Sequence, residues 1–299
     1  MMYYRRKILL ALLSVFDGKL TAKQLQKYLF LFTRLQGIKS FDFVPYRYGS
    51  FSFQANQDIA TLSKYGYCKI AETEKGRFYE LTKDEDFINT LKLEDKKKLI
   101  DVKAQFGHLS QTNLIRYTYQ QYPYYAIKST IAKDLLNRAE LKAIEQQKRH
   151  YFEKQLFTIG YEGISLETYI NKLIINDVNV LCDVRKNAYS QKYGFSKKTL
   201  QQACLGADIE YVHIPNLGIV SNKRQELHSQ ADYDVLFREY EKTTLNENKA
   251  SLLSIRNLLD KGKRVALTCF EKDPKQCHRT CVAHALMQLP KTDYQLKYL

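Results

Sequence analysis

The sequence lacks several features that would place it in a familiar class of protein. It has no run of about 18 apolar residues, so no segment is expected to span a membrane. The apolar segment 8–16 follows a basic start, but no small-residue cleavage site comes after it, and we interpret it as a helix rather than a signal peptide. Glycine-rich dinucleotide and Walker motifs are also absent, which argues against nicotinamide dehydrogenases and P-loop ATPases, and no cofactor is expected.

Cysteine is sparse and follows no regular spacing. The six cysteines occur without an export signal, which indicates reduced thiols in a cytoplasmic protein. A chain of 299 residues with 44% hydrophobic residues is long enough for two globular domains. We therefore expect a cytoplasmic protein with more than one folded part.

Charge of one sign dominates the first half of the chain. Residues 1–150 carry 26 Lys and Arg against 15 Asp and Glu, whereas the remainder carries 21 against 17. A basic half with tyrosines scattered through it fits a polyanionic partner, most simply nucleic acid, and DNA in particular. The alternative is a basic surface of solvated lysines without a polyanionic partner.

Residues 1–82 have the pattern of a winged helix-turn-helix. Three helical segments are expected: residues 5–16, a second helix opened by a capping box at Thr21 and Gln24, and a third helix capped by Ser50 or Ser52 and ended by Gly66. Two β-rich pieces, 67–70 and 77–81, follow as a hairpin. In such a domain the third helix enters a major groove and the hairpin contacts phosphates.

The expected nucleic-acid contacts come from the third helix and the hairpin. They are Gln54, Gln57, Lys64, Lys69, Lys75 and Arg77. The alternative is that this domain is a protein–protein adaptor. The words 43–52 (FVPYRYGSFS) and 62–67 (LSKYGY) also resemble the Panacea family of antitoxin-associated domains, over residues 5–82, although the Pro of its usual Gly-Pro-Phe-Ser word is missing. Residues 83–154 are expected to be a helical connector.

From residue 155 onward the pattern alternates strands and helices. Strands are expected at 156–159, 178–182, 211–214 and 265–269, with amphipathic helices between them. Repeated strand–helix units predict an α/β domain over 155–299 with a Rossmann-like, three-layer parallel sheet. Because the carboxyl ends of parallel strands meet at one edge, the polar residues that follow each strand are expected to share a single cleft.

The residues at these strand ends resemble a known family. The words TIGYEG (158–163), DVR (183–185), GFS (194–196), LG (217–218), CFE (269–271) and CHR (277–279), with Ser190, are similar to the bacterial family called domain of unknown function 488. The resemblance covers about residues 156–289. Ala188 and Tyr189 stand where the family often has Pro before the Ser. The resemblance implies the fold and the location of the site, but not a reaction.

Two carboxylates are the main candidates for chemistry at this edge. Asp183 and Glu271 are expected to act as general base and acid, or nucleophile and acid, with Tyr161 beside them. The alternative for Asp183 is simple pairing with Arg185 or Arg279. The groups expected to bind an anionic substrate are Arg185, Arg279, Ser190 and Gly160, and His278 lies with Arg279 at a helix N-terminus that favours phosphate.

The cysteines of the last segment allow three interpretations. Cys277, beside His278 and Arg279 at a helix start, is a candidate nucleophile. Cys269, Cys277, His278 and Cys281 are also metal-ligating residue types, but their spacing matches no zinc ribbon or finger, and no metal is expected. The third interpretation is that the thiols are small buried groups.

Three functions remain open from the sequence. The first is an enzyme that hydrolyses or transfers at a base or sugar of a nucleic acid or nucleotide, in bacterial defence against phage, and is targeted by the winged-helix domain. The second is a DNA-binding regulator or sensor whose Rossmann-like domain binds a nucleotide without turnover. The third is a protein–protein adaptor.

Overall fold

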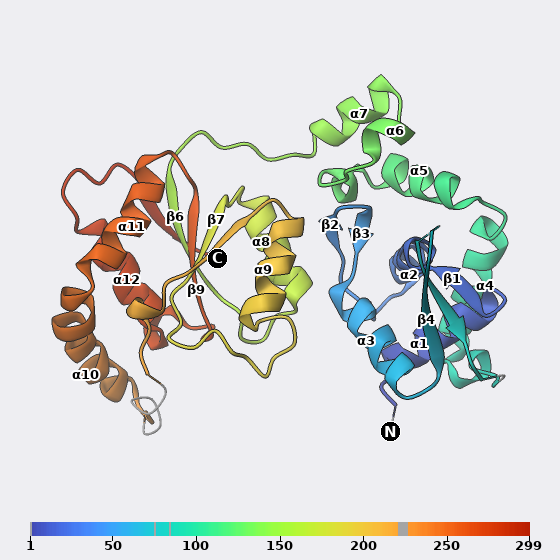
Figure 1. The fold of residues 1–299 in the computed structure, drawn as a ribbon, viewed down its shortest axis with the longest axis horizontal. Helices are drawn as coiled ribbons and strands as arrows, with labels where there is room; N and C mark the ends of the chain where they lie inside the picture. Colours follow the sequence, from blue (N-terminus) through green and yellow to red (C-terminus); the bar gives the residue numbers. More distant parts are fainter. Residues whose placement is uncertain (1, 75, 84, 221–226) are drawn as a thin grey trace. The chain divides into compact units, whose positions relative to one another are not determined.

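The chain divides into two compact units in the computed structural model. They comprise Met1–Lys148 and Arg149–Leu299, and the structure describes residues 2–74, 76–83, 85–220 and 227–299 (Figure 1). No helix among these residues combines the length and apolar character that crossing a bilayer requires. Each unit has its own hydrophobic core and is described separately.

The first unit is built from helices around a small antiparallel sheet. The sheet has the order β1-β5-β4, and a separate hairpin pairs β2 with β3. The elements of the first part are α1 (Tyr4–Val15), β1 (Lys19–Thr21), α2 (Ala22–Leu35), β2 (Val44–Tyr46), β3 (Gly49–Phe51), α3 (Phe53–Lys64), β4 (Cys68–Thr73) and β5 (Gly76–Leu81).

Local signals in the sequence explain where these helices begin and end. The predicted capping box of α2 is confirmed, because Thr21 Oγ1 accepts from Gln24 N at 3.0 Å and Gln24 Oε1 accepts from Thr21 N at 3.1 Å. Ser52 caps α3. Gly66 follows α3 with φ +72°, the left-handed conformation that glycine adopts most readily. The predicted hairpin is confirmed as β4 and β5.

Helices α1, α2 and α3 surround the core of this unit. All residues of α1 from Ile8 to Leu13 are buried, and α2 contributes Leu25, Leu29 and Phe32 to the core. Asp58 of α3 is also buried, and its carboxylate accepts from Arg5 Nε at 2.5 Å and from Arg6 Nε at 2.7 Å. This double ion pair joins α1 to α3 beside the apolar contacts.

Residues 83–148 pack as part of the same unit. Their elements are α4 (Leu93–Phe106), α5 (Gln111–Gln121), α6 (Ala132–Leu135) and α7 (Arg138–Glu145). Leu99 and Val102 of α4 and Leu114 of α5 belong to the core that α1 and α2 form. This segment, expected as a connector, therefore shares its apolar surface with the N-terminal helices.

The second unit contains a five-stranded parallel sheet with helices on both faces (Figure 1). Its strand order is β10-β6-β9-β7-β8. The elements are β6 (Gln155–Gly160), α8 (Leu166–Ile175), β7 (Val180–Asp183), α9 (Lys197–Gly206), β8 (Glu210–His213), α10 (Gln230–Tyr240), α11 (Lys249–Asp260), β9 (Val265–Cys269), α12 (His278–Met287) and β10 (Gln295–Tyr298). The α/β class is confirmed.

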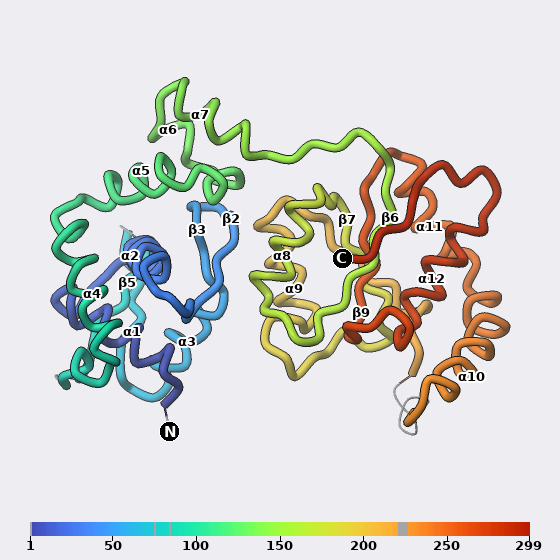
Figure 2. Tube along the Cα trace, turned by 180° about the vertical axis from the view of Figure 1, so that it is seen from behind, coloured from blue at the N-terminus to red at the C-terminus, as the bar shows by residue number. Residues whose placement is uncertain are grey.

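The sequence patterns indicate four of these strands but not β10. Gln295–Tyr298 pairs with β6, and Figure 2 shows the C-terminal segment beside that strand. Its residues are mostly exposed, so it lacks the apolar run that marks a buried strand. A half-exposed edge strand of this length carries little hydrophobic signal in the sequence.

The connections of the sheet reverse direction between β6 and β9. From β6 the chain passes through α8 toward β7, whereas from β9 it passes through α12 to β10 on the other side of β6. Helices α8 and α12 lie on opposite faces of the sheet (Figure 1). In open parallel sheets, ligands bind outside the carboxyl ends of strands at such a reversal. The topology therefore directs attention to the ends of β6 and β9.

Gly160 ends β6 where another segment passes against its backbone. A Cβ atom at this position would lie 1.9 Å from the backbone oxygen of Glu271, in the loop that follows β9. Tyr161 N and Glu162 N both donate to Phe270 O, at 3.1 and 2.9 Å. Only glycine allows this approach, which fixes the 270–272 loop over the end of β6.

We expect Gly160→Ala to destabilise the protein by about 1–3 kcal/mol, because the loop after β9 must move to admit the methyl group. Thermal and denaturant unfolding of the full chain would measure the change. Gly37→Ala is the matched control, since a Cβ there meets no atom within 4 Å. Equal stability of the two variants would contradict this account of Gly160.

Candidate functional site

Residues from four strand ends meet at the carboxyl edge of the sheet. Gly160 of β6 is in register with Cys269 of β9, and Asp183 of β7 is in register with both Thr268 of β9 and His213 of β8. These positions are separated by up to 109 residues in the chain and lie at one level of the sheet. The convergence expected from the sequence is therefore present in the backbone pairing.

Asp183 and Arg185 form a buried ion pair at the centre of this edge. Arg185 Nε donates to Asp183 Oδ1 at 2.8 Å, and Nη2 donates to Oδ2 at 2.5 Å. Tyr211 of β8 donates to the same Oδ2 at 2.6 Å. The Asp183 side chain is fully buried and the Arg185 side chain is 6% exposed. Both carboxylate oxygens of Asp183 thus have strong donors.

Arg185 also connects this pair to β6 and to the loop after β7. Its Nη1 donates to the hydroxyl of Tyr161 at 2.7 Å and to Phe195 O at 2.9 Å. The rings of Tyr161 and Phe195 stack with centroids 4.2 Å apart and an interplanar angle of 7°. Burial, and then the negative charge of Asp183, raise the pKa of Tyr211 well above its usual value, so this hydroxyl stays a donor.

Asp183 therefore has the geometry of a positioning residue. Its carboxylate is closed off from solvent and saturated by Arg185 and Tyr211. This arrangement matches the alternative considered from the sequence, pairing with Arg185, and leaves no oxygen facing a substrate. Arg185 is likewise enclosed, so the anion-binding role expected for it has no open face in this geometry.

Ser190 and Lys192 shape the loop between β7 and α9. Ser190 O accepts from Ser196 Oγ at 3.0 Å, and Ser190 Oγ accepts from Lys192 N at 3.2 Å. Lys192 Nζ reaches across to Tyr161 O at 2.7 Å. Ser190, expected to bind an anion, thus also serves the internal bonding of its own loop.

Arg279 is held under the loop that follows β9. Its Nη1 donates to Glu271 O at 2.6 Å and its Nη2 to Lys272 O at 3.3 Å. The side chain is buried, and within the described residues its Nε–H has no hydrogen-bond acceptor. The guanidinium expected to bind phosphate therefore donates from two of its nitrogens to backbone carbonyls of the loop.

Two thiols and an imidazole gather beside this loop. The ligand atoms of Cys269, Cys277 and His278 all lie within 4.8 Å of one another, and the three side chains are buried. Cys269 Sγ donates to Glu271 Oε2 at 3.3 Å. Burial, followed by the proximity of Cys269, raises the pKa of Cys277 well above its usual value, which opposes the nucleophilic thiolate considered from the sequence.

Comparison with protein families finds a match within the second unit. Residues 165–286 match the model of the family described as "Domain of unknown function DUF488". We call this matched region the DUF488 domain. The resemblance inferred from the strand-end words is confirmed over this range, whereas the Panacea resemblance of the first unit stays a prediction. No curated protein and no solved structure matches the chain.

The DUF488 domain also has a hollow beside the residues that follow β7 and β8. It has a volume of about 300 Å³ and lies next to Lys186, Asn216 and Gly218, with Glu239 and Tyr240 of α10 opposite. Gly218 packs directly against the backbone of Lys186, and a Cβ there would lie 2.0 Å from Lys186 N. This contact explains the glycine of the Leu217-Gly218 word, which carries no side-chain chemistry.

The side chains that sequence reasoning missed are mainly aromatic. Tyr211, Phe195 and Phe270 complete the surroundings of Arg185 and Tyr161. Phe195 and Phe270 stand inside the quoted motif words, so the words themselves were the available signal. Phe270 is 42% exposed and follows Cys269 directly. It gives the rim of the site an exposed aromatic ring.

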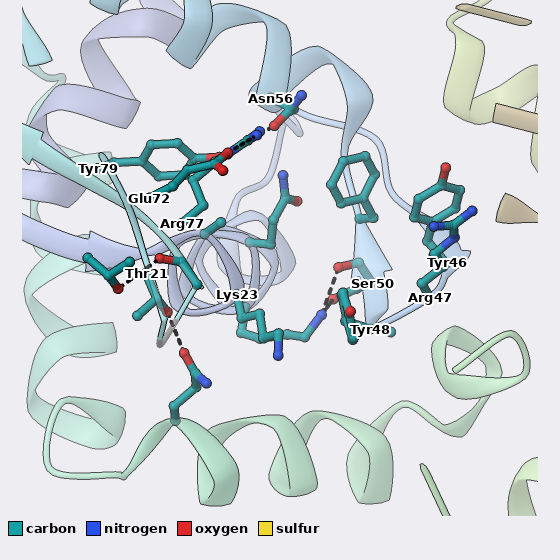
Figure 3. A pocket seen from close by; sticks show the side chains of 18 residues that line it. Thr21, Lys23, Tyr46, Arg47, Tyr48, Ser50, Asn56, Glu72, Arg77 and Tyr79 are labelled. Atoms are coloured by element: carbon teal, nitrogen blue, oxygen red, sulfur yellow. Dashed lines mark hydrogen bonds and ion pairs between the residues drawn. The ribbon is translucent and has the colours of Figure 1, made fainter. Parts of the chain in front are cut away.

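A second candidate site lies in the first unit (Figure 3). A pocket of about 640 Å³ is lined by α2, by the β2–β3 hairpin and by the β4–β5 hairpin. Its basic side chains are Lys23, Lys27, Arg47 and Arg77, and its aromatic side chains are Tyr46, Tyr48, Phe51 and Tyr79. Glu72 also lines the pocket and forms an ion pair with Arg77, with Glu72 Oε1 2.5 Å from Arg77 Nη2.

Lys27 is an unusual member of this pocket because its ammonium group is buried. It donates to Ser50 O at 2.8 Å, and no carboxylate pairs with it among the residues that the structure describes. Burial, and then the charge of Lys23, lower the pKa of Lys27 to about 7. Lys23 itself lies over the Tyr48 ring, 4.4 Å from its centroid.

The residues expected to contact nucleic acid are distributed over α3 and the β4–β5 hairpin. Gln57, Lys64 and Lys69 are exposed. Gln54 donates to Asp58 at 3.1 Å, and Arg77 pairs with Glu72. Lys75 lies outside the described residues. Arg77 is exposed as well, so it remains accessible to a partner together with Gln57, Lys64 and Lys69.

We expect Asp183→Ala to destabilise the protein by about 3–5 kcal/mol, because it leaves the Arg185 charge buried without its carboxylate. Asp260→Ala is the matched control. Its carboxylate pairs with Arg256 at 2.7 Å on the surface, and removal of such a pair costs about 1 kcal/mol or less. Denaturant unfolding measures both variants, and a similar small loss in both would contradict the role given to Asp183.

Proposed function

We propose that the protein is an enzyme that acts on a nucleic acid or nucleotide, by hydrolysis or transfer at a base or sugar. In this proposal the DUF488 domain carries the chemistry and the basic first unit binds the nucleic acid. A role in bacterial defence against phage is part of the same proposal. The observation that carries it is the partly buried carboxylate of Glu271 at the point where the sheet connections reverse.

Glu271 has properties that suit acid–base chemistry at this edge. It lies two residues past the end of β9, is partly buried, and follows the exposed residue Phe270. A partly desolvated carboxylate can pass a proton to a leaving group or accept one from water. An exposed aromatic ring beside it offers a surface on which a nucleobase stacks. Together, the Glu271 carboxylate and the Phe270 ring favour a substrate that contains a nucleobase.

The roles of the two carboxylates are unequal in this proposal. Glu271 is the acid–base residue, and Asp183 acts through Arg185 by holding the guanidinium, Tyr161 and the loop after β7 in place. This modifies the equal acid and base roles expected from the sequence. Its physical basis is that Asp183 already accepts from Arg185 and Tyr211 through both oxygens.

The first unit suits a winged-helix domain that binds nucleic acid. Its three helices α1, α2 and α3, followed by the β4–β5 hairpin, support this proposal, although the β2–β3 hairpin stands between α2 and α3. The exposed lysines Lys64 and Lys69 lie on α3 and on the hairpin. The nearby pocket adds basic groups to aromatic rings, a combination that binds phosphates and stacked bases.

The enzymatic proposal is tested by incubating the full chain with DNA, RNA and nucleotides and analysing the products by mass spectrometry. We expect turnover, and we expect Glu271→Gln to lower it by about 10²–10⁴-fold because the proton donor is lost. Glu210→Gln is the matched control, since Glu210 is exposed at the amino end of β8, away from the strand ends of the site. Its turnover is expected to equal that of the wild type.

The outcome also separates this proposal from its rival, a regulator that binds a nucleotide without turnover. Under that rival a ligand binds, changes DNA affinity and is recovered intact. Turnover that survives in Glu271→Gln would contradict the role of Glu271. The absence of any product from all the substrates would contradict the enzymatic proposal itself.

Nucleic-acid binding is tested separately by measuring the affinity for duplex DNA at several salt concentrations. We expect Lys64→Ala with Lys69→Ala to weaken binding and to lower the salt slope by about 2, one for each lost phosphate contact. Lys97→Ala with Lys133→Ala removes the same charge from exposed positions on α4 and α6 and is expected to leave the slope unchanged. Lys23→Ala with Arg47→Ala reports whether the pocket contributes to the same binding. Binding that ignores salt would contradict the nucleic-acid partner and favour a protein–protein adaptor.

A further inference from the structure

The buried cluster of Cys269, Cys277 and His278 is a further feature that the proposed function does not use. We propose that these three residues bind a transition-metal ion of the Zn²⁺ class. Two thiol sulfurs and one imidazole nitrogen form the donor set that zinc prefers in proteins. This proposal concerns metal binding and does not depend on the reaction or on the substrate.

The spacing of the ligand atoms suits a tetrahedral ion. Cys269 Sγ lies 3.7 Å from His278 Nδ1. In a tetrahedral zinc site, usual bond lengths place a sulfur and a nitrogen ligand about 3.6 Å apart. All three ligand atoms lie within 4.8 Å of one another. The Cys269–His278 distance already matches this spacing, and rotation of the Cys277 side chain can bring its sulfur to the same ion.

The imidazole of His278 is held in the orientation that a metal ligand needs. Its Nε2 lies 2.9 Å from the backbone oxygen of Val184, just past the end of β7. A carbonyl oxygen only accepts, so Nε2 carries the proton and Nδ1 presents its lone pair to the two sulfurs. A ligand histidine that donates its other N–H to a carbonyl is the usual outer support of a zinc site.

The backbone explains how adjacent residues can both face one ion. Cys277 is extended, with φ −134° and ψ 127°, and caps α12, whereas His278 is the first residue of that helix. The change from extended to helical backbone turns both side chains toward Cys269 at the end of β9. The ligands thus come from a strand end and a helix start, which the spacing rules for ribbons and fingers do not describe.

Charge and burial favour a divalent ion in this position. Two thiolates cancel the charge of a divalent cation, so the occupied cluster is neutral in a buried environment. Cys269 and Cys277 each lie at most 1% exposed, and His278 is equally enclosed. The carboxylate of Glu271 lies next to this cluster, with its Oε2 3.3 Å from Cys269 Sγ.

Cys281 is not part of this cluster, in contrast to the set of four considered from the sequence. It lies in the hydrophobic core that α10, α11 and α12 form with the sheet, and it is absent from the group of ligand atoms that meet. The structure therefore distinguishes two cysteines of α12 and its cap that are only four positions apart. This difference supplies an internal control.

The test uses the full chain, reduced and stripped of metal, and titrated with Co²⁺ and then Zn²⁺. We expect one Co²⁺ per chain with the charge-transfer absorption of cobalt–thiolate bonds and the visible bands of a tetrahedral ion, displaced by one Zn²⁺. Cys269→Ser and Cys277→Ser are expected to abolish the thiolate absorption stepwise and to weaken Zn²⁺ binding by at least about 100-fold. Cys281→Ser is expected to behave as the wild type.

Folding of each variant is checked by circular dichroism, and the wild-type titration supplies a measurement that needs no variant. A wild-type chain without cobalt–thiolate absorption would overturn the proposal. So would an absorption that persists when Cys269 and Cys277 are both replaced. Because no substrate is present, a negative result in the turnover assay leaves this test unaffected.

Discussion

The buried pair of Asp183 and Arg185 is the interaction on which the candidate site depends. The Arg185 guanidinium joins the end of β7 to Tyr161, which follows β6, and to Phe195, which precedes α9. Tyr211 of β8 donates to the Asp183 carboxylate. A buried pair of this kind is costly to break because each charge is left without a partner. It therefore keeps several chain-distant segments at fixed positions around one edge of the sheet.

In the DUF488 domain, the buried charged residues hold the site in place, and other residues are left to contact a substrate. Asp183, Arg185 and Arg279 are all buried, and their hydrogen bonds go to protein atoms. The groups left near the surface are Glu271 and Phe270, in a loop that Gly160 allows to pass over the end of β6. The charged residues of the motifs thus build a rigid frame, and the loop after β9 presents the accessible carboxylate.

Much of the fold was predictable because its local signals are strong. The Thr21–Gln24 capping box, Gly66 after α3 and the apolar strands of the parallel sheet each have a recognisable pattern. The edge strand β10 was not predictable, since its exposed residues carry no apolar run. The packing of α4 and α5 into the first core was also hidden, because the charged residues of this segment suggest a connector. The residues that pack into the core are Leu99, Val102 and Leu114.

The sequence by itself determined which residues follow each strand and therefore which residues share an edge, because parallel strands place their carboxyl ends together. Only the tertiary structure decided what each of them does. Whether Asp183 faces a substrate or Arg185, and whether Cys277 or Cys281 joins Cys269 and His278, depends on side-chain direction and burial. Those depend on how the strands pair and how the loops after them pack, for example Gly160 of β6 beside Cys269 of β9, which spacing along the chain does not encode.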